Sequence, residues 1–297
     1  MTPELLAAIP QPPIQIEMPQ TEELIFTIAG ALPTVALVGL GARHLLTGRG
    51  PLLLWCLLGG LLASLYEPFV DVMGLVYLPE SGSIGTFTLL DREMPLFVPL
   101  IYPWYVGGLA YLTFRLFERG IDRMGLFKLW VAFAVVDWVL EVPAVLTDVY
   151  AYYGNAPFDV WGHPMWWGFM HSLVAIAGGA MIYGLRHHLR GRAVVLVAPI
   201  IFMADGMVNA GVGYPTHAAL NADASYWVTY PASLLTFALG AVVLWLIGGV
   251  LGRPTGTPEG ATGPAEGDPV PTPVAATPEP ADESRVRRPA SVGGEKP

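Results

Sequence analysis

The chain has 297 residues, of which 54% are hydrophobic and 13% are charged, and its formal net charge at pH 7 is −9. Soluble domains carry about 25% charged residues, so this composition indicates a membrane protein. The basic residues form no continuous groove, which argues against nucleic-acid binding. Cys56 is the only cysteine, which excludes an intramolecular disulfide and a cysteine zinc site.

Seven apolar stretches approach the length of about 20 residues that a helix needs to cross a bilayer. They cover residues 24–46, 51–78, 94–117, 126–149, 164–186, 193–214 and 226–251. The sequence therefore predicts an all-α integral membrane protein with a seven-helix transmembrane domain at 22–252. Residues 1–21, which lack the basic start of a signal peptide, are expected outside the cytoplasm. The Pro-, Gly- and Thr-rich residues 253–297 are expected to form a disordered cytoplasmic tail.

The distribution of basic residues predicts the orientation of these helices. Fourteen of the fifteen Lys and Arg residues border one set of connections, and only Arg92 lies in the other set. The positive-inside rule then places the N-terminus outside and the C-terminus inside. We expect a multi-pass protein of a bacterial plasma membrane.

Acidic residues inside the apolar stretches are the main functional signal. Three pairs of polar residues have i, i+4 spacing: Glu67 and Asp71, Asp137 and Glu141, and Asp205 and Asn209. Residues four apart share one face of a helix. A carboxylate in hydrocarbon is costly, so such residues usually face a cavity or the bundle interior. The predicted orientation puts these pairs in the outer half, and we expect the five acids to be catalytic residues of one cavity.

Aromatic residues and one histidine occur at a matching depth. We expect a set of them to bind substrate together with Asn209: Tyr66, Tyr102, Tyr105, Trp138, Trp167, His171 and Tyr230. The aromatic belt at a membrane interface accounts for other rings near the helix ends. The connection at 150–164 is unusually aromatic, and it is expected either to cover the outer mouth or to rest on lipid headgroups.

These residues favour acid–base chemistry with no metal and no other cofactor. No lysine lies deep in the seventh stretch, which excludes a retinal Schiff base, and no Asp-rich magnesium motif or histidine box occurs. A zinc site of His171 with two acids is an unspecific alternative. Paired carboxylates share a proton, so one can act as acid and its neighbour as base. Aromatic rings stabilise cations by about 0.5–2 kcal/mol each.

The chain resembles the integral-membrane terpene cyclases of meroterpenoid pathways in its architecture and in two short segments, Tyr66-Glu67-Pro68 and Ala204-Asp205-Gly206. The resemblance implies a seven-helix enzyme whose Glu67 and Asp205 protonate an alkene or epoxide of an isoprenoid-like lipid, leading to cyclisation, isomerisation or hydration. The chain is also similar to membrane sterol isomerases and carotenoid-modifying enzymes. The acids of the fourth stretch and the long tail depart from the cyclase pattern. The resemblance therefore leaves open which residue of this chain has which catalytic role.

Two other classes of function stay open. Acids at mid-depth in several helices also occur in proton-coupled transporters and channels, although the sequence has no visible inverted repeat. A membrane protein that binds a lipid or pigment without converting it would need a similar cavity.

Overall fold

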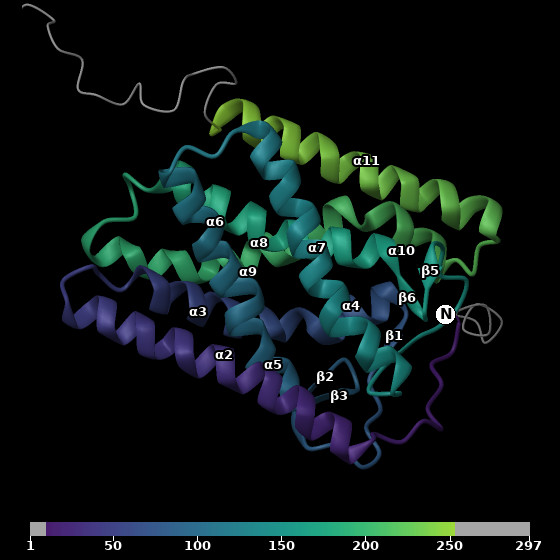
Figure 1. Cartoon of the computed structure of the whole chain (residues 1–297). Coiled ribbons are helices and arrows are strands. Elements are labelled where there is room, and N and C mark those ends of the chain that lie inside the picture. Colours follow the sequence, from purple (N-terminus) through teal and green to yellow (C-terminus); the bar gives the residue numbers. More distant parts are fainter. Residues whose placement is uncertain (1–9, 253–297) are drawn as a thin grey trace, which may run out of the picture. The chain divides into compact units, whose positions relative to one another are not determined.

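The computed structural model describes residues 10–252 (Figure 1). In this part of the chain seven segments are long and apolar enough to cross a membrane, which confirms the predicted number of helices and, to within a few residues, their ends. They are Gln20–Leu46, Leu52–Gly74, Phe97–Glu118, Arg123–Leu146, Met165–Leu185, Gly191–Val212 and Tyr226–Val250. The predicted tail at 253–297 and the first nine residues lie outside the described residues.

Four of the seven segments are continuous helices, and three are interrupted. The continuous ones are α2 (Gln20–Leu46), α7 (Arg123–Leu146), α8 (Met165–Leu185) and α11 (Tyr226–Val250). The second segment consists of α3 (Leu52–Ala63), the 3₁₀ turn η1 (Ser64–Tyr66) and α4 (Glu67–Gly74). The third consists of α5 (Phe97–Tyr102), the π-helix η2 (Pro103–Gly108) and α6 (Leu109–Glu118). The sixth consists of the 3₁₀ helix η3 (Gly191–Leu196), α9 (Val197–Met207) and the π-helix η4 (Val208–Val212), and α10 (Tyr214–Asn221) follows it.

Proline and glycine account for the interruption of the third segment. Pro103 has no N–H to continue an α-helical hydrogen-bond ladder, and the π-helix begins there. Gly107 lies against α3, where an added Cβ atom would come within 2.2 Å of the carbonyl oxygen of Cys56. The wide turn and the glycine together let this segment approach α3 closely. Single turns of π-helix inside α-helices often occur at functional sites.

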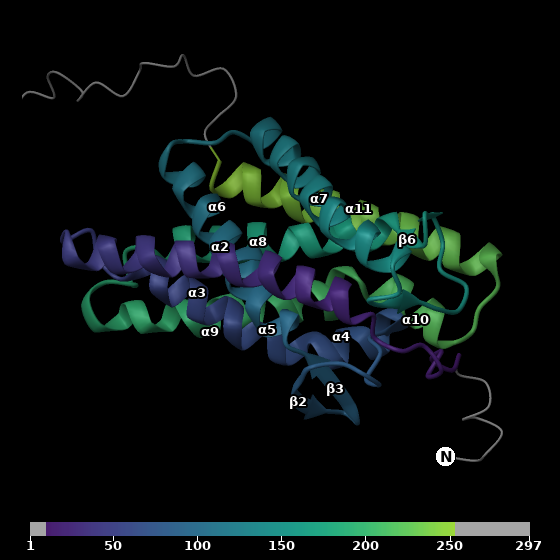
Figure 2. The same ribbon diagram turned by 60° about the horizontal axis from the view of Figure 1, so that its bottom comes forward.

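Three short two-stranded antiparallel sheets lie in the connections. β1 (Val76–Tyr77) pairs with β4 (Ala151–Tyr152), β2 (Gly85–Leu89) with β3 (Arg92–Pro95), and β5 (Asp159–Val160) with β6 (His163–Pro164). The first pairing opposes Val76 to Tyr152 and so joins the connection after α4 to the connection after α7. The β2–β3 hairpin stands apart from the helices (Figure 2).

The connections divide between two ends of the bundle. Strands β1, β5 and β6 and helix α10 lie at the right of Figure 1, and the β2–β3 hairpin lies below the centre. The short connections from α2 to α3, α6 to α7 and α8 to η3 lie toward the left. Buried side chains concentrate on α8 and on the interrupted segments, and α2, α7 and α11 expose long apolar rows. Apolar rows of this kind suit contact with lipid chains, which are as apolar as leucine.

A candidate acidic cavity with a histidine cluster

A cavity lies among the interrupted segments, α7 and α8, and the space in it that is open to water-sized molecules is about 80 Å³. The gaps between the lining side chains and the open mouth bring the total empty volume to about 770 Å³. Its polar and aromatic lining is Glu67, Asp71, Glu141, Asp205, His171, Tyr102, Tyr105, Tyr150, Tyr152, Trp167, Phe26 and Phe97, with aliphatic side chains between them. Four of the five predicted acids and four of the predicted substrate-binding residues thus lie on one cavity.

Three of these acids, Glu67, Asp71 and Asp205, form what we call the acid cluster. Glu67 begins α4 and accepts a hydrogen bond from the hydroxyl of Tyr102. Asp71 is 1% exposed, and neither of its carboxylate oxygens has a hydrogen-bond partner among the described residues. No Lys, Arg or His side chain of the described residues lies within ion-pair distance of these three carboxyls.

Asp205 is held by its predicted partner one turn along the helix. The side-chain amide of Asn209 donates a hydrogen bond of 2.9 Å to Oδ1 of Asp205 and another of 3.1 Å to its backbone oxygen. Oδ2 of Asp205 is buried and has no partner among the described residues. One oxygen of this carboxyl is therefore anchored, and the other is free to act on a molecule in the cavity.

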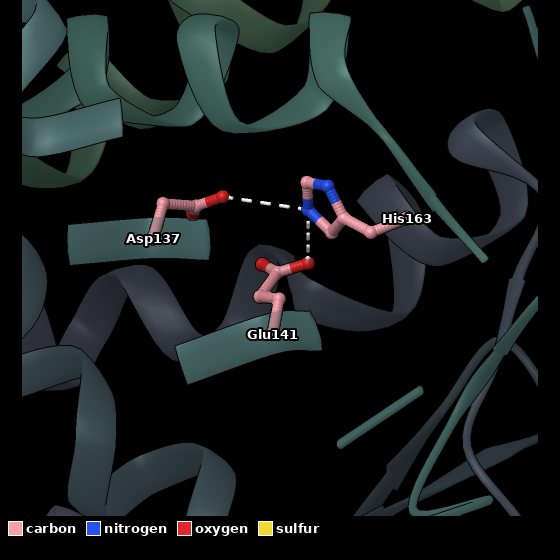
Figure 3. Close-up of side chains that lie close together, drawn as sticks. All are labelled: Asp137, Glu141 and His163. Atoms are coloured by element: carbon pink, nitrogen blue, oxygen red, sulfur yellow. Dashed lines mark ion pairs between the residues drawn. The ribbon is translucent and has the colours of Figure 1, made fainter. Parts of the chain in front are cut away.

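Glu141 and His171 of the cavity lining belong to what we call the histidine cluster, namely Asp137, Glu141, His163 and His171. Nε2 of His163 lies 3.0 Å from Oε2 of Glu141 and 3.5 Å from Oδ2 of Asp137 (Figure 3). Nδ1 of His171 lies 3.9 Å from the second oxygen of each carboxylate. Asp137 does not line the cavity itself, but it lies directly behind Tyr105, whose hydroxyl donates a 2.6 Å hydrogen bond to Oδ1.

The two carboxylates set the electrostatics of the connection that follows α7. Burial lowers the pKa of His163, but the facing Asp137 and Glu141 outweigh this effect and raise it to about 10. Burial and the charge of Glu141 raise the pKa of the Tyr150 and Tyr152 hydroxyls well above their ordinary value. Tyr152 therefore keeps its proton and donates a 2.5 Å hydrogen bond to Oε2 of Glu141.

Three predicted substrate-binding residues lie away from the cavity lining. Tyr66 stacks on Phe202 with ring centroids 4.5 Å apart. Trp138 contacts the rings of Trp161 and His163 from the outer side of α7. Tyr230 is 39% exposed and contacts Phe158 and Tyr226.

The connection at 150–164 supplies three site residues that the sequence analysis did not name, His163, Tyr150 and Tyr152. Its richness in aromatic residues was the available signal, and it predicted either a cover or a contact with lipid headgroups without identifying which side chains point inward. In the structure Tyr150 and Tyr152 line the cavity, and His163 is fully buried beside it. This segment therefore forms part of the cavity wall.

Comparison with known proteins finds no matching family model, curated protein or solved structure. The resemblance to membrane terpene cyclases gains no support from these comparisons. A function for the chain therefore has to be argued from the geometry of the cavity.

Proposed function

We propose that the chain is a membrane enzyme that protonates an isoprenoid-like lipid, with Asp205 as the proton donor. The observation that carries the proposal is the free Oδ2 of Asp205, which is buried at an aromatic-lined cavity while Asn209 holds Oδ1. A buried carboxyl group without a cation favours its neutral, protonated form. Because it is buried away from water, such a group can give its proton directly to a substrate in the cavity.

The surrounding rings suit the intermediate of such a reaction. Transfer of the Asp205 proton to one carbon of an alkene leaves a carbocation on its neighbour. The faces of Tyr102, Tyr105 and Trp167 can stabilise this cation by about 0.5–2 kcal/mol each. Return of a proton from an adjacent carbon to the carboxylate left on Asp205 gives an isomerised or cyclised alkene. Capture of water, which then loses one proton to the same carboxylate, gives an alcohol. The proton count balances without a bound cofactor.

The proposal includes the membrane setting. The N-terminus is placed outside and the C-terminus inside a bacterial plasma membrane, and the substrate is a hydrophobic lipid that enters from the bilayer. The apolar lining from α2 and α5, including Phe26, Phe97 and Ile101, supports such a substrate. The same lining would also suit a protein that binds a lipid without converting it.

The test starts from the lipids of the source membrane. Lipids that co-purify with the protein are identified by mass spectrometry, and an isoprenoid fraction containing them is incubated with the protein in D₂O. We expect a product with deuterium bound to carbon. General acid–base steps contribute about 10²–10⁴-fold, so Asp205→Asn should lower the rate by that factor. Glu118→Gln, at the far end of α6, is the matched control.

The alternatives give different results in the same experiment. Full turnover in each of the three single variants Asp205→Asn, Glu67→Gln and Asp71→Asn would rule out acid catalysis by this cluster. A flux driven by a pH gradient in proteoliposomes, lost in the same variants, would identify a proton-coupled transporter. Tight binding of an isoprenoid that the protein never converts would identify a binding protein.

Trp167→Ala should change the product mixture more than the rate, because it alters the cation's surroundings and leaves the proton source in place.

A further inference from the structure

The histidine cluster places three metal-ligand atoms around one point. Nε2 of His163, Oδ2 of Asp137 and Oε2 of Glu141 all lie within 4.8 Å of one another. In a tetrahedral zinc site with bonds of about 2.0–2.1 Å, neighbouring ligand atoms are separated by roughly 3.3 Å. The separations of 3.0 Å and 3.5 Å from Nε2 bracket that value. The two carboxylate oxygens lie no more than 4.8 Å apart, so a closing movement of up to about 1.5 Å between them would complete such a site.

Two of these ligand groups are buried with atoms that lack a hydrogen-bond partner. His163 is 0% exposed and Asp137 is 1% exposed. Nδ1 of His163 has no hydrogen-bond partner among the described residues, and Oδ2 of Asp137 faces only Nε2 of His163, at 3.5 Å. Buried polar atoms are nearly always satisfied by protein or by a bound species. Oδ2 of Asp137 and Oε2 of Glu141 both face Nε2 of His163 (Figure 3), an arrangement that a bound ion can bridge.

The remaining contacts of the carboxylates orient them toward that point. Tyr105 holds Oδ1 of Asp137 at 2.6 Å, so Oδ2 is directed at His163. The indole nitrogen of Trp167 donates to Oε1 of Glu141 at 3.3 Å, and Oε2 faces both His163 and the hydroxyl of Tyr152. Outer contacts of this kind fix the ligands of metal sites and tune their affinity.

Charge and donor type select the class of ion. Two carboxylates lie side by side on α7, and the cationic side chains within ion-pair distance of them in the described part of the chain are the imidazoles of His163 and His171, with no Lys or Arg. On binding to His163, a divalent cation would displace its proton and offset the charge of the carboxylates. Imidazole nitrogen suits Zn²⁺, Fe²⁺ and related transition metals, whereas Mg²⁺ and Ca²⁺ prefer oxygen ligands alone.

We propose that Asp137, Glu141 and His163 bind a divalent transition metal ion of the Zn²⁺ type in the wall of the cavity. Three protein ligands leave one coordination position open, as in catalytic zinc sites. Glu141 also lines the cavity, so the ion would lie at the surface that a cavity ligand reaches. A bound ion would supply a Lewis acid there. The site does not depend on the acid cluster and goes beyond the proposed function.

Metal analysis of the purified full-length protein tests the proposal. The protein is prepared without a histidine tag, stripped with a chelator, reloaded with Zn²⁺ and dialysed. We expect one zinc per chain, a rise in thermal midpoint on loading, and an X-ray absorption spectrum with a single imidazole and otherwise oxygen neighbours. Asp137→Asn, Glu141→Gln and His163→Gln should each lose the bound ion and the thermal rise. The matched control is the double variant His187→Gln with His188→Gln, which removes two exposed histidines of a basic connection.

Three results would overturn the site. The first is wild-type protein that retains no zinc above a buffer blank. The second is zinc retained equally by the three ligand variants, and the third is zinc lost equally in the His187/His188 control. The X-ray spectrum of the wild-type protein decides the matter even if a ligand variant does not fold. Asp205→Asn should keep its zinc, so loss of turnover in that variant with full metal content separates the two proposals.

Discussion

The hydroxyl of Tyr105 donates a 2.6 Å hydrogen bond to Oδ1 of Asp137, and both side chains are more than nine-tenths buried. The bond joins the π-helix η2 to α7 across the interior of the bundle. A neutral donor from one helix thereby orients a carboxylate of another, whose free oxygen faces His163.

Tyr105→Phe should destabilise the protein. The change leaves a buried carboxylate oxygen without its donor, and hydrogen bonds to charged groups contribute about 1.5–3 kcal/mol. The free energy of unfolding in detergent measures the effect. Tyr214→Phe is the control, because Tyr214 is 63% exposed. Equal stability of the two variants would show that the Tyr105 bond is unimportant. If the metal site exists, Tyr105→Phe should also weaken zinc binding by about 10–100-fold.

Gly107→Ala and Gly39→Ala should have opposite effects. A Cβ atom at Gly107 would meet the backbone of Cys56 at 2.2 Å, whereas nothing lies within 4 Å of a Cβ atom at Gly39. Overpacking costs about 1–3 kcal/mol, and replacing a helical glycine by alanine in open space gains about 0.5–1 kcal/mol. Thermal unfolding of both variants in the same detergent tests this difference. A stable Gly107→Ala protein would mean that α3 and η2 separate without cost.

His217 should make the protein sensitive to acid. Burial, followed by the nearby charge of His171, lowers the pKa of His217 from 6.5 to about 3. Below pH 6.5 the unfolded chain binds a proton at this residue that the folded protein does not bind. Stability is therefore lost as the pH falls, by about 2 kcal/mol at pH 5. His217→Gln should remove this part of the pH dependence between pH 7 and pH 5. Parallel stability curves for the two proteins would contradict the assignment.

The orientation of the bundle can be tested with cysteine labelling, since Cys56 is fully buried. Thr88→Cys in strand β2 should react with a membrane-impermeant maleimide in intact cells. Thr47→Cys, in the connection from α2 to α3, should react only after the membrane is permeabilised. The reverse pattern would invert the orientation that the basic residues predict.

The helices and the acids of the cavity could be predicted from sequence because both follow simple periodicities. Length and hydropathy located the seven segments, and i, i+4 spacing placed Asp137 with Glu141 and Asp205 with Asn209. The same spacing rule explains two placements that differ from expectation. Tyr66 and Trp138 directly neighbour acids, but consecutive helical residues point about 100° apart. Their rings therefore face Phe202 and Trp161 instead of the cavity.

His163 could not be located by any periodicity. It lies 22 positions after Glu141, outside a transmembrane helix, and its place depends on the β5–β6 pairing that opposes it to Val160. Contacts between a connection and a helix depend on the whole path of the chain. The sequence analysis expected no metal because it found no Asp-rich motif and no histidine box, and the one zinc site that it left as an alternative used His171.

The π-helix η2 connects the acid cluster to the histidine cluster. Tyr102, just before it, donates to Glu67 of the acid cluster, and Tyr105, within it, donates to Asp137 of the histidine cluster. Removing one residue from the wide turn would rotate both phenols by about 100° relative to α6. A single deletion would thus disconnect both carboxylates at once. The positions of both carboxylates therefore depend on the length of this segment as well as on its side chains.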